Sequence, residues 1–271
     1  MKYIFIDIDG TLIGSFDHHI PDSTTKAITK AKQNGHRIFL CTGRPLSQAD
    51  MFKSDLFDGI ICSAGCYAEI NNEVLFERIL SNEDMNRIIN TLDAYGINYI
   101  LEGKIGNYYL EKGRETFMEL FKHYDANMKW EDIIQNLGLF DMELMAKDVI
   151  YKITYYTCDK ELINKVKNEL SDSFQMVYTD RGEGNMVEVE IMYNDCNKAE
   201  GIKQVINHFG ATLDDTIAFG DSMNDYEMIQ ECSIGVAMGN ACDELKEVAD
   251  YVTTHVLEDG IYNAFEKLEL I

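Results

Sequence analysis

The sequence is poor in positive charge. Its 24 Lys and Arg residues stand against 47 Asp and Glu residues, which gives a formal net charge of −23 at pH 7. Proteins that bind nucleic acids neutralise backbone phosphates with Lys and Arg, and anionic membrane surfaces attract basic segments. The composition therefore argues against a nucleic-acid partner and against a membrane surface.

Long apolar runs and paired cysteines are also missing. No stretch approaches the roughly 18 uncharged apolar residues of a membrane-spanning helix, and the apolar run Tyr3–Ile6 ends at Asp7, too soon for the core of a signal peptide. The seven cysteines are scattered without a C-x-x-C pair, which supports neither a zinc ribbon nor a thioredoxin-like redox site. We therefore expect a cytoplasmic protein with free thiols.

Both ends of the chain alternate short apolar strands with helices. Strands are expected at 3–8, 36–40, 59–62, 216–219, 233–237 and 251–253. Strands that alternate with helices in this way are typical of a parallel sheet covered by helices on both faces.

The middle of the chain has a different pattern, in which helices are mixed with closely spaced strands. Strands are expected at 97–101, 107–110, 149–157, 174–178 and 187–192, the last one half-buried because apolar residues alternate with Glu188 and Glu190. We predict an α/β protein with a Rossmann-like parallel-sheet core (1–83 and 187–271) and an inserted α+β domain with an antiparallel sheet (84–186). With only two prolines and no Gly/Ser-rich linker, these boundaries are accurate to a few residues.

The first cluster of candidate functional residues follows the first strand. Asp7 and Asp9 are two residues apart, and Gly10 lets the chain turn away from them. Such a pair of carboxylates can hold Mg2+ and divide nucleophilic attack and proton transfer between them. Taken alone, the pair is equally consistent with two solvated acids in a turn.

Three further clusters also follow core strands or begin helices. Thr42 and Gly43 offer a hydroxyl and backbone N–H groups suited to phosphate, although Thr42 can also act simply as a helix N-cap. Lys198 can balance phosphate charge or be a solvated surface lysine. The segment 220–225 contributes two carboxylates and an amide, which suit a hard cation.

In this order the four clusters resemble the motifs of the haloacid dehalogenase superfamily. The matching segments are Asp7-x-Asp9-Gly10-Thr11, Thr42-Gly43-Arg44, Lys198 and Gly220-Asp221-x-x-Asn224-Asp225, and the tail Val236–Ala241 is similar to the Cof-type branch of phosphatases. The resemblance implies a phosphatase with an HAD-like core, in which the inserted domain is a cap that sets substrate specificity.

The resemblance also implies a role for each motif residue. Asp7 is expected to be the nucleophile that forms an aspartyl phosphate, and Asp9 the general acid and base. Mg2+ is expected at Asp7, the backbone carbonyl of Asp9 and Asp221, with Asp225 either supporting the metal through water or positioning Lys198. The phosphate is expected to be bound by four residues: Thr42, Gly43, Lys198 and Asn224.

The substrate expected from the resemblance is a small phosphorylated metabolite, with sugar phosphates first and cofactor phosphates second. Arg44 and, in a glycine-rich turn of the inserted domain, Arg181, Glu183 and Asn185 are nominated for specificity. Ala64 departs from the Asn that Cof-type relatives usually carry, which affects an expected substrate or cap contact. Two alternatives stay open, a phosphomutase of the same superfamily and a non-catalytic ligand-binding or regulatory member; the sequence is silent on oligomeric state.

The net charge of −23 does not conflict with an anionic substrate. A bound Mg2+ together with Lys198 makes a local positive centre within a negative surface.

Overall fold

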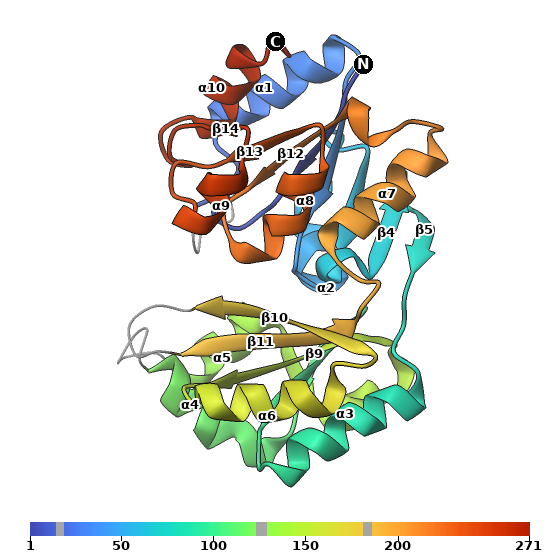
Figure 1. Ribbon diagram of the computed structural model, residues 1–271, viewed down its shortest axis with the longest axis vertical. Helices are drawn as coiled ribbons and strands as arrows, with labels where there is room; N and C mark the ends of the chain where they lie inside the picture. Colours follow the sequence, from blue (N-terminus) through green and yellow to red (C-terminus); the bar gives the residue numbers. More distant parts are fainter. Residues whose placement is uncertain (15–18, 123–128, 181–185) are drawn as a thin grey trace. The chain divides into compact units, whose positions relative to one another are not determined.

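The computed structural model describes residues 1–14, 19–122, 129–180 and 186–271 (Figure 1). The chain divides into two compact units. One comprises residues 1–44, 52–77 and 196–271, and the other comprises residues 45–51 and 78–195. No helix in the described ranges is long and apolar enough to cross a membrane.

The first unit is built on an eight-stranded sheet. Its strands, in spatial order, are β14 (Tyr251–Val252), β13 (Ile234–Ala237), β12 (Thr216–Gly220), β1 (Tyr3–Ile6), β2 (Arg37–Cys41), β3 (Gly59–Cys62), β4 (Tyr67–Ile70) and β5 (Glu73–Glu77). From β14 to β3 all neighbours are parallel, as predicted, whereas β4 and β5 form an antiparallel hairpin at the edge that the sequence reading did not predict. The turn of this hairpin is Asn71-Asn72, both with positive φ, the conformation of a two-residue hairpin turn.

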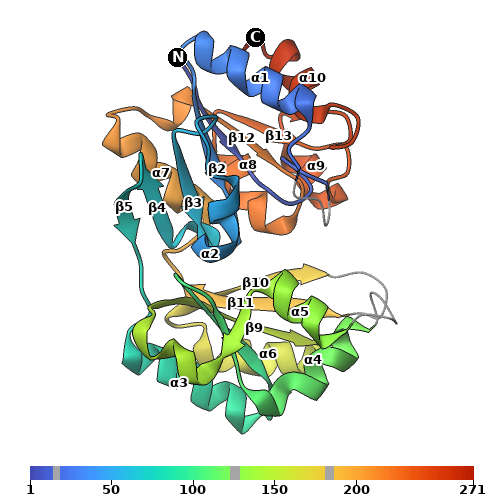
Figure 2. The same cartoon turned by 180° about the vertical axis from the view of Figure 1, so that it is seen from behind.

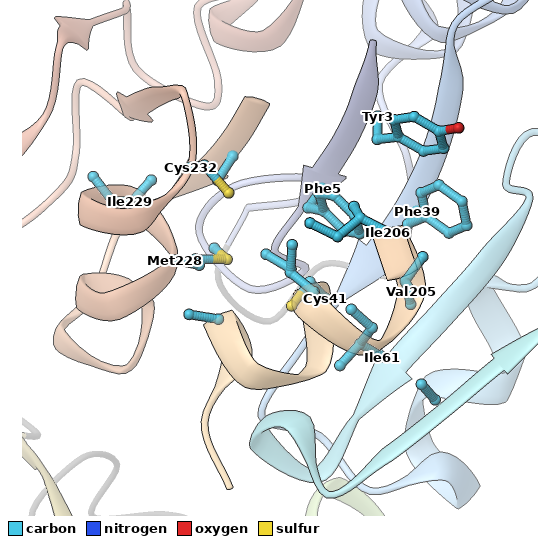
Figure 3. Packing of buried hydrophobic residues seen from close by; sticks show 14 of the residues in the cluster. Tyr3, Phe5, Phe39, Cys41, Ile61, Val205, Ile206, Met228, Ile229 and Cys232 are labelled. Carbon is cyan, nitrogen blue, oxygen red and sulfur yellow. The ribbon is translucent and has the colours of Figure 1, made fainter. Parts of the chain in front are cut away.

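Helices cover the parallel sheet because each has one apolar face. They are α1 (Asp22–Gln33), α7 (Lys198–His208), α8 (Tyr226–Glu231), α9 (Asp243–Val248) and α10 (Gly260–Lys267). In α1, for example, buried residues recur at positions 24, 27, 28 and 31, the spacing of one helix face. Figure 3 shows Phe5 and Phe39 of the sheet packed near Val205 of α7, in a core that also includes Met228 of α8.

The second unit contains a six-stranded sheet. Its strands, in spatial order, are β10 (Phe174–Asp180), β11 (Val187–Tyr193), β9 (Ile150–Thr157), β6 (Tyr99–Gly103), β7 (Asn107–Tyr109) and β8 (Leu139–Asp141). Its neighbours are antiparallel except for the parallel pair β7 and β8. The α/β class with an antiparallel sheet in a second unit is therefore confirmed.

Four longer helices and one short one belong to this unit. They are α2 (Leu46–Ala49), α3 (Asn82–Ala94), α4 (Arg114–Phe121), α5 (Trp130–Leu137) and α6 (Lys160–Leu170). Figures 1 and 2 show α3 and α6 side by side along one face of the sheet. Helix α5 and strand β8 were not predicted. The chain also has six 3-10 segments: η1 (Asp50–Phe52), η2 (Ser63–Gly65), η3 (Glu111–Gly113), η4 (Met142–Lys147), η5 (Leu213–Asp215) and η6 (Met223–Asp225).

The second unit extends beyond the predicted insert of 84–186. It begins at Arg78 and continues to Asp195, because β11 pairs with β9 and β10 rather than with the first sheet. All seven residues of β11 are buried, which corrects the prediction of a half-buried strand.

Candidate active site

The predicted motifs meet at the carboxyl ends of neighbouring parallel strands. Strand β1 lies between β12 and β2, with Ile6 opposite Phe219 on one side and Leu40 on the other. The backbone N–H of Asp7 continues this ladder and donates to the carbonyl of Phe219 at 3.0 Å. Because the strands end at one edge of the sheet, the loops that follow them, 7–11, 42–44 and 221–225, lie together there.

A buried lysine links these loops. Lys198 is the first residue of α7 and is fully buried. Its Nζ donates to Oδ1 of Asp7 at 2.6 Å, to Oδ1 of Asp225 at 2.5 Å and to Oδ1 of Asn224 at 3.0 Å. Burial lowers the pKa of Lys198, but the carboxylates of Asp225 and Asp7 together raise it by more. The ammonium therefore stays charged between acids from distant parts of the sequence.

Asp225 is completely buried, and protein donors contact both of its carboxylate oxygens. Oδ1 accepts from Lys198, while Oδ2 accepts from the backbone N–H groups of Asp221 and Ser222 at 2.9 and 3.0 Å. Gly220 permits this arrangement, because a Cβ there would lie 2.5 Å from Cβ of Asp225. Of the two roles that the resemblance implies for Asp225, these contacts match the positioning of Lys198.

Three carboxylates form a candidate metal centre. Asp7, Asp221 and Asp225 each have an oxygen within 4.8 Å of the oxygens of the other two. Burial, and then the charge of Asp225, raises the pKa of Asp221 to about 7, and burial raises the pKa of Asp7 well above its usual value despite the nearby Lys198. Three acids around one ammonium are thus undercompensated, and their oxygens are the ligand type that Mg2+ prefers. The residues present fit a divalent cation.

The loop after Asp7 is fixed against the acid of the last motif. Gly10 has φ +77°, and a Cβ there would lie 2.2 Å from Oδ2 of Asp221, so only glycine fits. Thr11 donates from its hydroxyl to Oδ1 of Asp221 at 3.1 Å. Asn240, in the tail that resembles the Cof-type branch, donates from Nδ2 to the carbonyl of Gly10 at 2.8 Å and accepts from the N–H of Val256 at 2.9 Å. No role was predicted for Asn240, although its segment was singled out.

Asp9 is held by Arg44. The guanidinium donates from Nε to Oδ2 at 2.7 Å and from a terminal nitrogen to Oδ1 at 2.5 Å, a two-bond ion pair. The Asp9 side chain is 48% exposed, while Arg44 is mostly covered and lies over the ring of Phe52 at 5.3 Å. Arg44 was nominated for substrate specificity; the structure instead pairs it with the candidate general acid, a contact that sequence spacing does not reveal.

The phosphate-binding candidates of the second motif adjoin Asn224. Thr42 is buried, and its hydroxyl accepts from the backbone N–H of Arg44 at 3.1 Å. A Cβ on Gly43 would lie 3.2 Å from Nδ2 of Asn224. The structure therefore brings Thr42, Gly43, Lys198 and Asn224 into one region of the first unit.

The turn after β3 supports the second motif. The N–H groups of Ser63 and Ala64 donate to the carbonyls of Arg44 and Thr42 at 2.9 and 3.1 Å. Ser63 and Ala64 have φ of +50° and +52°, a region costly for residues with a Cβ. Ala64, the departure noted in the sequence, thus contacts the motif through its backbone. Arg181, Glu183 and Asn185 lie outside the described residues.

A sequence profile of the haloacid dehalogenase-like hydrolases matches residues 4–265. The chain is 30% identical over 269 residues to the 5-amino-6-(5-phospho-D-ribitylamino)uracil phosphatase YcsE of Bacillus subtilis, a match that covers 97% of this chain and 94% of that protein. It is 26% identical over 264 residues to the B. subtilis phosphatase YitU, whose name gives the same substrate, with coverage of 95% and 94%.

A solved structure gives the same result. The HAD subclass IIB sugar phosphatase BT4131 matches with a TM-score of 0.79 and 27% identity, over 100% of both chains. The chain therefore belongs to the haloacid dehalogenase-like hydrolases and is a phosphatase of that family.

Proposed function

We propose that the chain is a Mg2+-dependent phosphatase that hydrolyses small phosphorylated metabolites through an aspartyl-phosphate intermediate. The observation that carries this proposal is the buried Lys198 held between Asp7 and Asp225. A carboxylate beside a fixed positive charge suits nucleophilic attack on a phosphate ester, whose reaction depends on positioning and on charge stabilisation. A protein that only binds its ligand has no need of the second, half-exposed acid Asp9, which argues against the non-catalytic alternative.

In the first half of the proposed reaction, a carboxylate oxygen of Asp7 attacks the phosphorus atom. The bond between phosphorus and the leaving oxygen breaks, and Asp9 donates a proton to that oxygen, so that an alcohol departs. Lys198, the hydroxyl of Thr42 and the backbone at Gly43 stabilise the charge on the phosphoryl oxygens.

The second half returns both acids to their starting forms. Asp9 takes a proton from water, the water oxygen attacks the phosphorus, and the bond from phosphorus to Asp7 breaks to release inorganic phosphate. Arg44 acts as a positioning residue, because its two hydrogen bonds fix the carboxylate of Asp9 in one orientation.

In this proposal Mg2+ is held by Asp7, Asp221 and the backbone carbonyl of Asp9. When bound, the cation supplies positive charge to the phosphoryl oxygens. Lys198 favours the ionised, nucleophilic form of Asp7 against the burial that raises the pKa of that acid.

For the substrate we propose sugar phosphates first and cofactor-pathway phosphates second. The names of BT4131, YcsE and YitU support both classes. A phosphomutase needs cationic groups that rebind a second phosphate, whereas the buried polar face of the second sheet carries more carboxylates than ammonium groups, as described below. The cytoplasmic location stays a prediction.

The test is hydrolysis of para-nitrophenyl phosphate with Mg2+ and after chelation by EDTA. We expect phosphate release that requires the metal and is lost in Asp7→Asn, while Asp55→Asn, at an exposed aspartate, serves as the matched control. Full activity in EDTA or in Asp7→Asn would contradict the proposal. Lack of any metal-dependent turnover would favour the non-catalytic alternative.

A further inference from the structure

One face of the second sheet carries a band of buried polar side chains. In the register of the sheet Asn107 of β7 is opposite Glu102 of β6, and Glu102 is opposite Lys152 of β9. Glu190 of β11 is opposite Thr154, the next residue of β9 on the same face. These side chains therefore form one continuous band across four strands.

The band is nearly closed to solvent and is held by its own hydrogen bonds. Glu102, Lys152 and Glu190 are between 2% and 7% exposed. The Lys152 ammonium pairs with Glu102 at 3.1 Å and also with Glu190, and Thr154 donates its hydroxyl to Glu102. Burial raises the pKa of Glu102 to about 7, although Lys152 opposes this shift.

A third carboxylate extends the band along β9 and β11. Glu188 is 7% exposed and accepts from the hydroxyl of Tyr156 at 2.7 Å. Three glutamates therefore surround one ammonium, and the band repels an anionic group when the glutamates are ionised.

Two buried acceptors in the band have no hydrogen-bond partner among the described residues. They are Oε2 of Glu190 and Oδ1 of Asn107, on side chains that are 6% and 5% exposed. A buried polar atom without a partner is costly, and native proteins seldom leave one. Both atoms can only accept, so a matching ligand must bring hydrogen-bond donors.

We propose that this band, centred on Lys152 and Glu190, is a binding site for a hydroxyl- or amine-bearing organic group that lacks a second anionic substituent. The inference rests on the proposed function in one respect, since it takes that group to be the organic part of the phosphorylated substrate. Hydroxyl or ammonium protons bond to Glu190 and Asn107, and the three glutamates disfavour a carboxylate or a second phosphate.

Three sugar phosphates that differ mainly in one group test the site. Glucosamine 6-phosphate, glucose 6-phosphate and 6-phosphogluconate present an ammonium, a neutral polyol and an added carboxylate. We expect kcat/KM to fall in that order, with 6-phosphogluconate at least tenfold below glucose 6-phosphate. Equal kcat/KM for all three, or a preference for 6-phosphogluconate, would overturn the inference.

The decisive variant is Glu190→Gln, which keeps the size of the side chain and removes its charge. A hydrogen bond to a charged group corresponds to about a tenfold to hundredfold effect, so kcat/KM for glucosamine 6-phosphate should fall by that factor. Hydrolysis of para-nitrophenyl phosphate, whose leaving group offers no such donors, should stay within about twofold. The matched control is Glu161→Gln, at an exposed glutamate of α6.

Calorimetric titration provides a readout without turnover. In an Asp7→Asn background, the Kd for glucosamine 6-phosphate should rise about tenfold or more when Glu190→Gln is added. If Glu190→Gln changes neither kinetics nor Kd, and only alters unfolding, the band is a structural ion cluster and the inference is wrong. If the wild-type protein hydrolyses no aryl phosphate with Mg2+, the proposed function fails, whereas the calorimetric comparison still tests the site.

Discussion

Asp221 and Asp225 should respond in opposite ways to the same substitution. In Asp225→Asn one carboxylate oxygen becomes an amide nitrogen, which cannot accept. Either the Lys198 ammonium or the pair of backbone N–H groups at 221 and 222 then faces another donor. Breaking a buried ion pair on one side costs about 3–5 kcal/mol. We expect Asp225→Asn to lower the free energy of unfolding by that amount.

Asp221→Asn should instead stabilise the protein when no metal is present. Burial, and next the charge of Asp225, raises the pKa of Asp221 to about 7 from its usual 3.8. A carboxyl whose pKa is raised by folding costs nothing below the unfolded value and destabilises the fold as pH rises through the folded value. At about 1.4 kcal/mol per unit the shift sets an upper limit of about 4 kcal/mol. Since Asp221 is partly exposed, screening reduces this to about 1–2 kcal/mol.

The assay is urea unfolding in EDTA at pH 4 and pH 8. Asp221→Asn should match the wild type at pH 4 and exceed it at pH 8, while Asp225→Asn should be less stable at pH 8. Adding Mg2+ should stabilise the wild type but not Asp221→Asn, because only a protein that binds the ion gains from it. Equal destabilisation by both variants at pH 8, or a gain in Asp221→Asn that does not depend on pH, would refute the reasoning.

Three other substitutions test the second motif and the turn that supports it. Arg44→Lys retains the charge but not the two-bond geometry toward Asp9; kcat should fall about tenfold with KM little changed, and a pH–rate profile identical in shape and height to the wild type would contradict this. Ala64→Gly should raise the free energy of unfolding by about 0.5–1 kcal/mol, because glycine avoids a left-handed penalty of about 1–2 kcal/mol but loses more chain entropy. Gly65→Ala should lower it by about 3 kcal/mol or more, since its Cβ would lie 2.0 Å from the carbonyl oxygen of Asn197; urea unfolding measures both, and unchanged stability in the second variant would be inconsistent with that contact.

The core could be predicted from the sequence because its strands and motifs are local features. The residues after β1, β2 and β12 were assigned to strand ends from short apolar runs, and parallel topology then brings these ends together. Helix α6 was predicted with its observed bounds, Lys160–Leu170. Helix α5 was missed although its signal is present: apolar residues at 130, 133, 134 and 137 fit one helix face, and Gly138 ends it with φ +58°.

The contacts that could not be predicted join residues far apart in the sequence. Arg44 meets Asp9 across 35 residues, so neither motif indicates the pair by itself. Glu188 and Glu190 alternate with apolar residues and were read as the solvent side of a strand. They are buried because Tyr156 and Lys152, on the neighbouring strand, supply hydrogen bonds and charge. That information lies in the register between strands, which hydrophobic alternation does not encode.

The two buried lysines show how similar charge arrangements can serve different ligands. Lys198 and Lys152 each lie among three carboxylates, so both clusters have surplus negative charge. Around Lys198 the aspartate oxygens are close enough to share one ion, and a divalent cation can balance the surplus. Around Lys152 the glutamates are engaged separately along the sheet, with Thr154 and Tyr156 as additional partners. There, donors from an organic ligand can satisfy the remaining acceptors one by one, so charge alone does not decide what an acidic cluster binds; the spacing of its oxygens does.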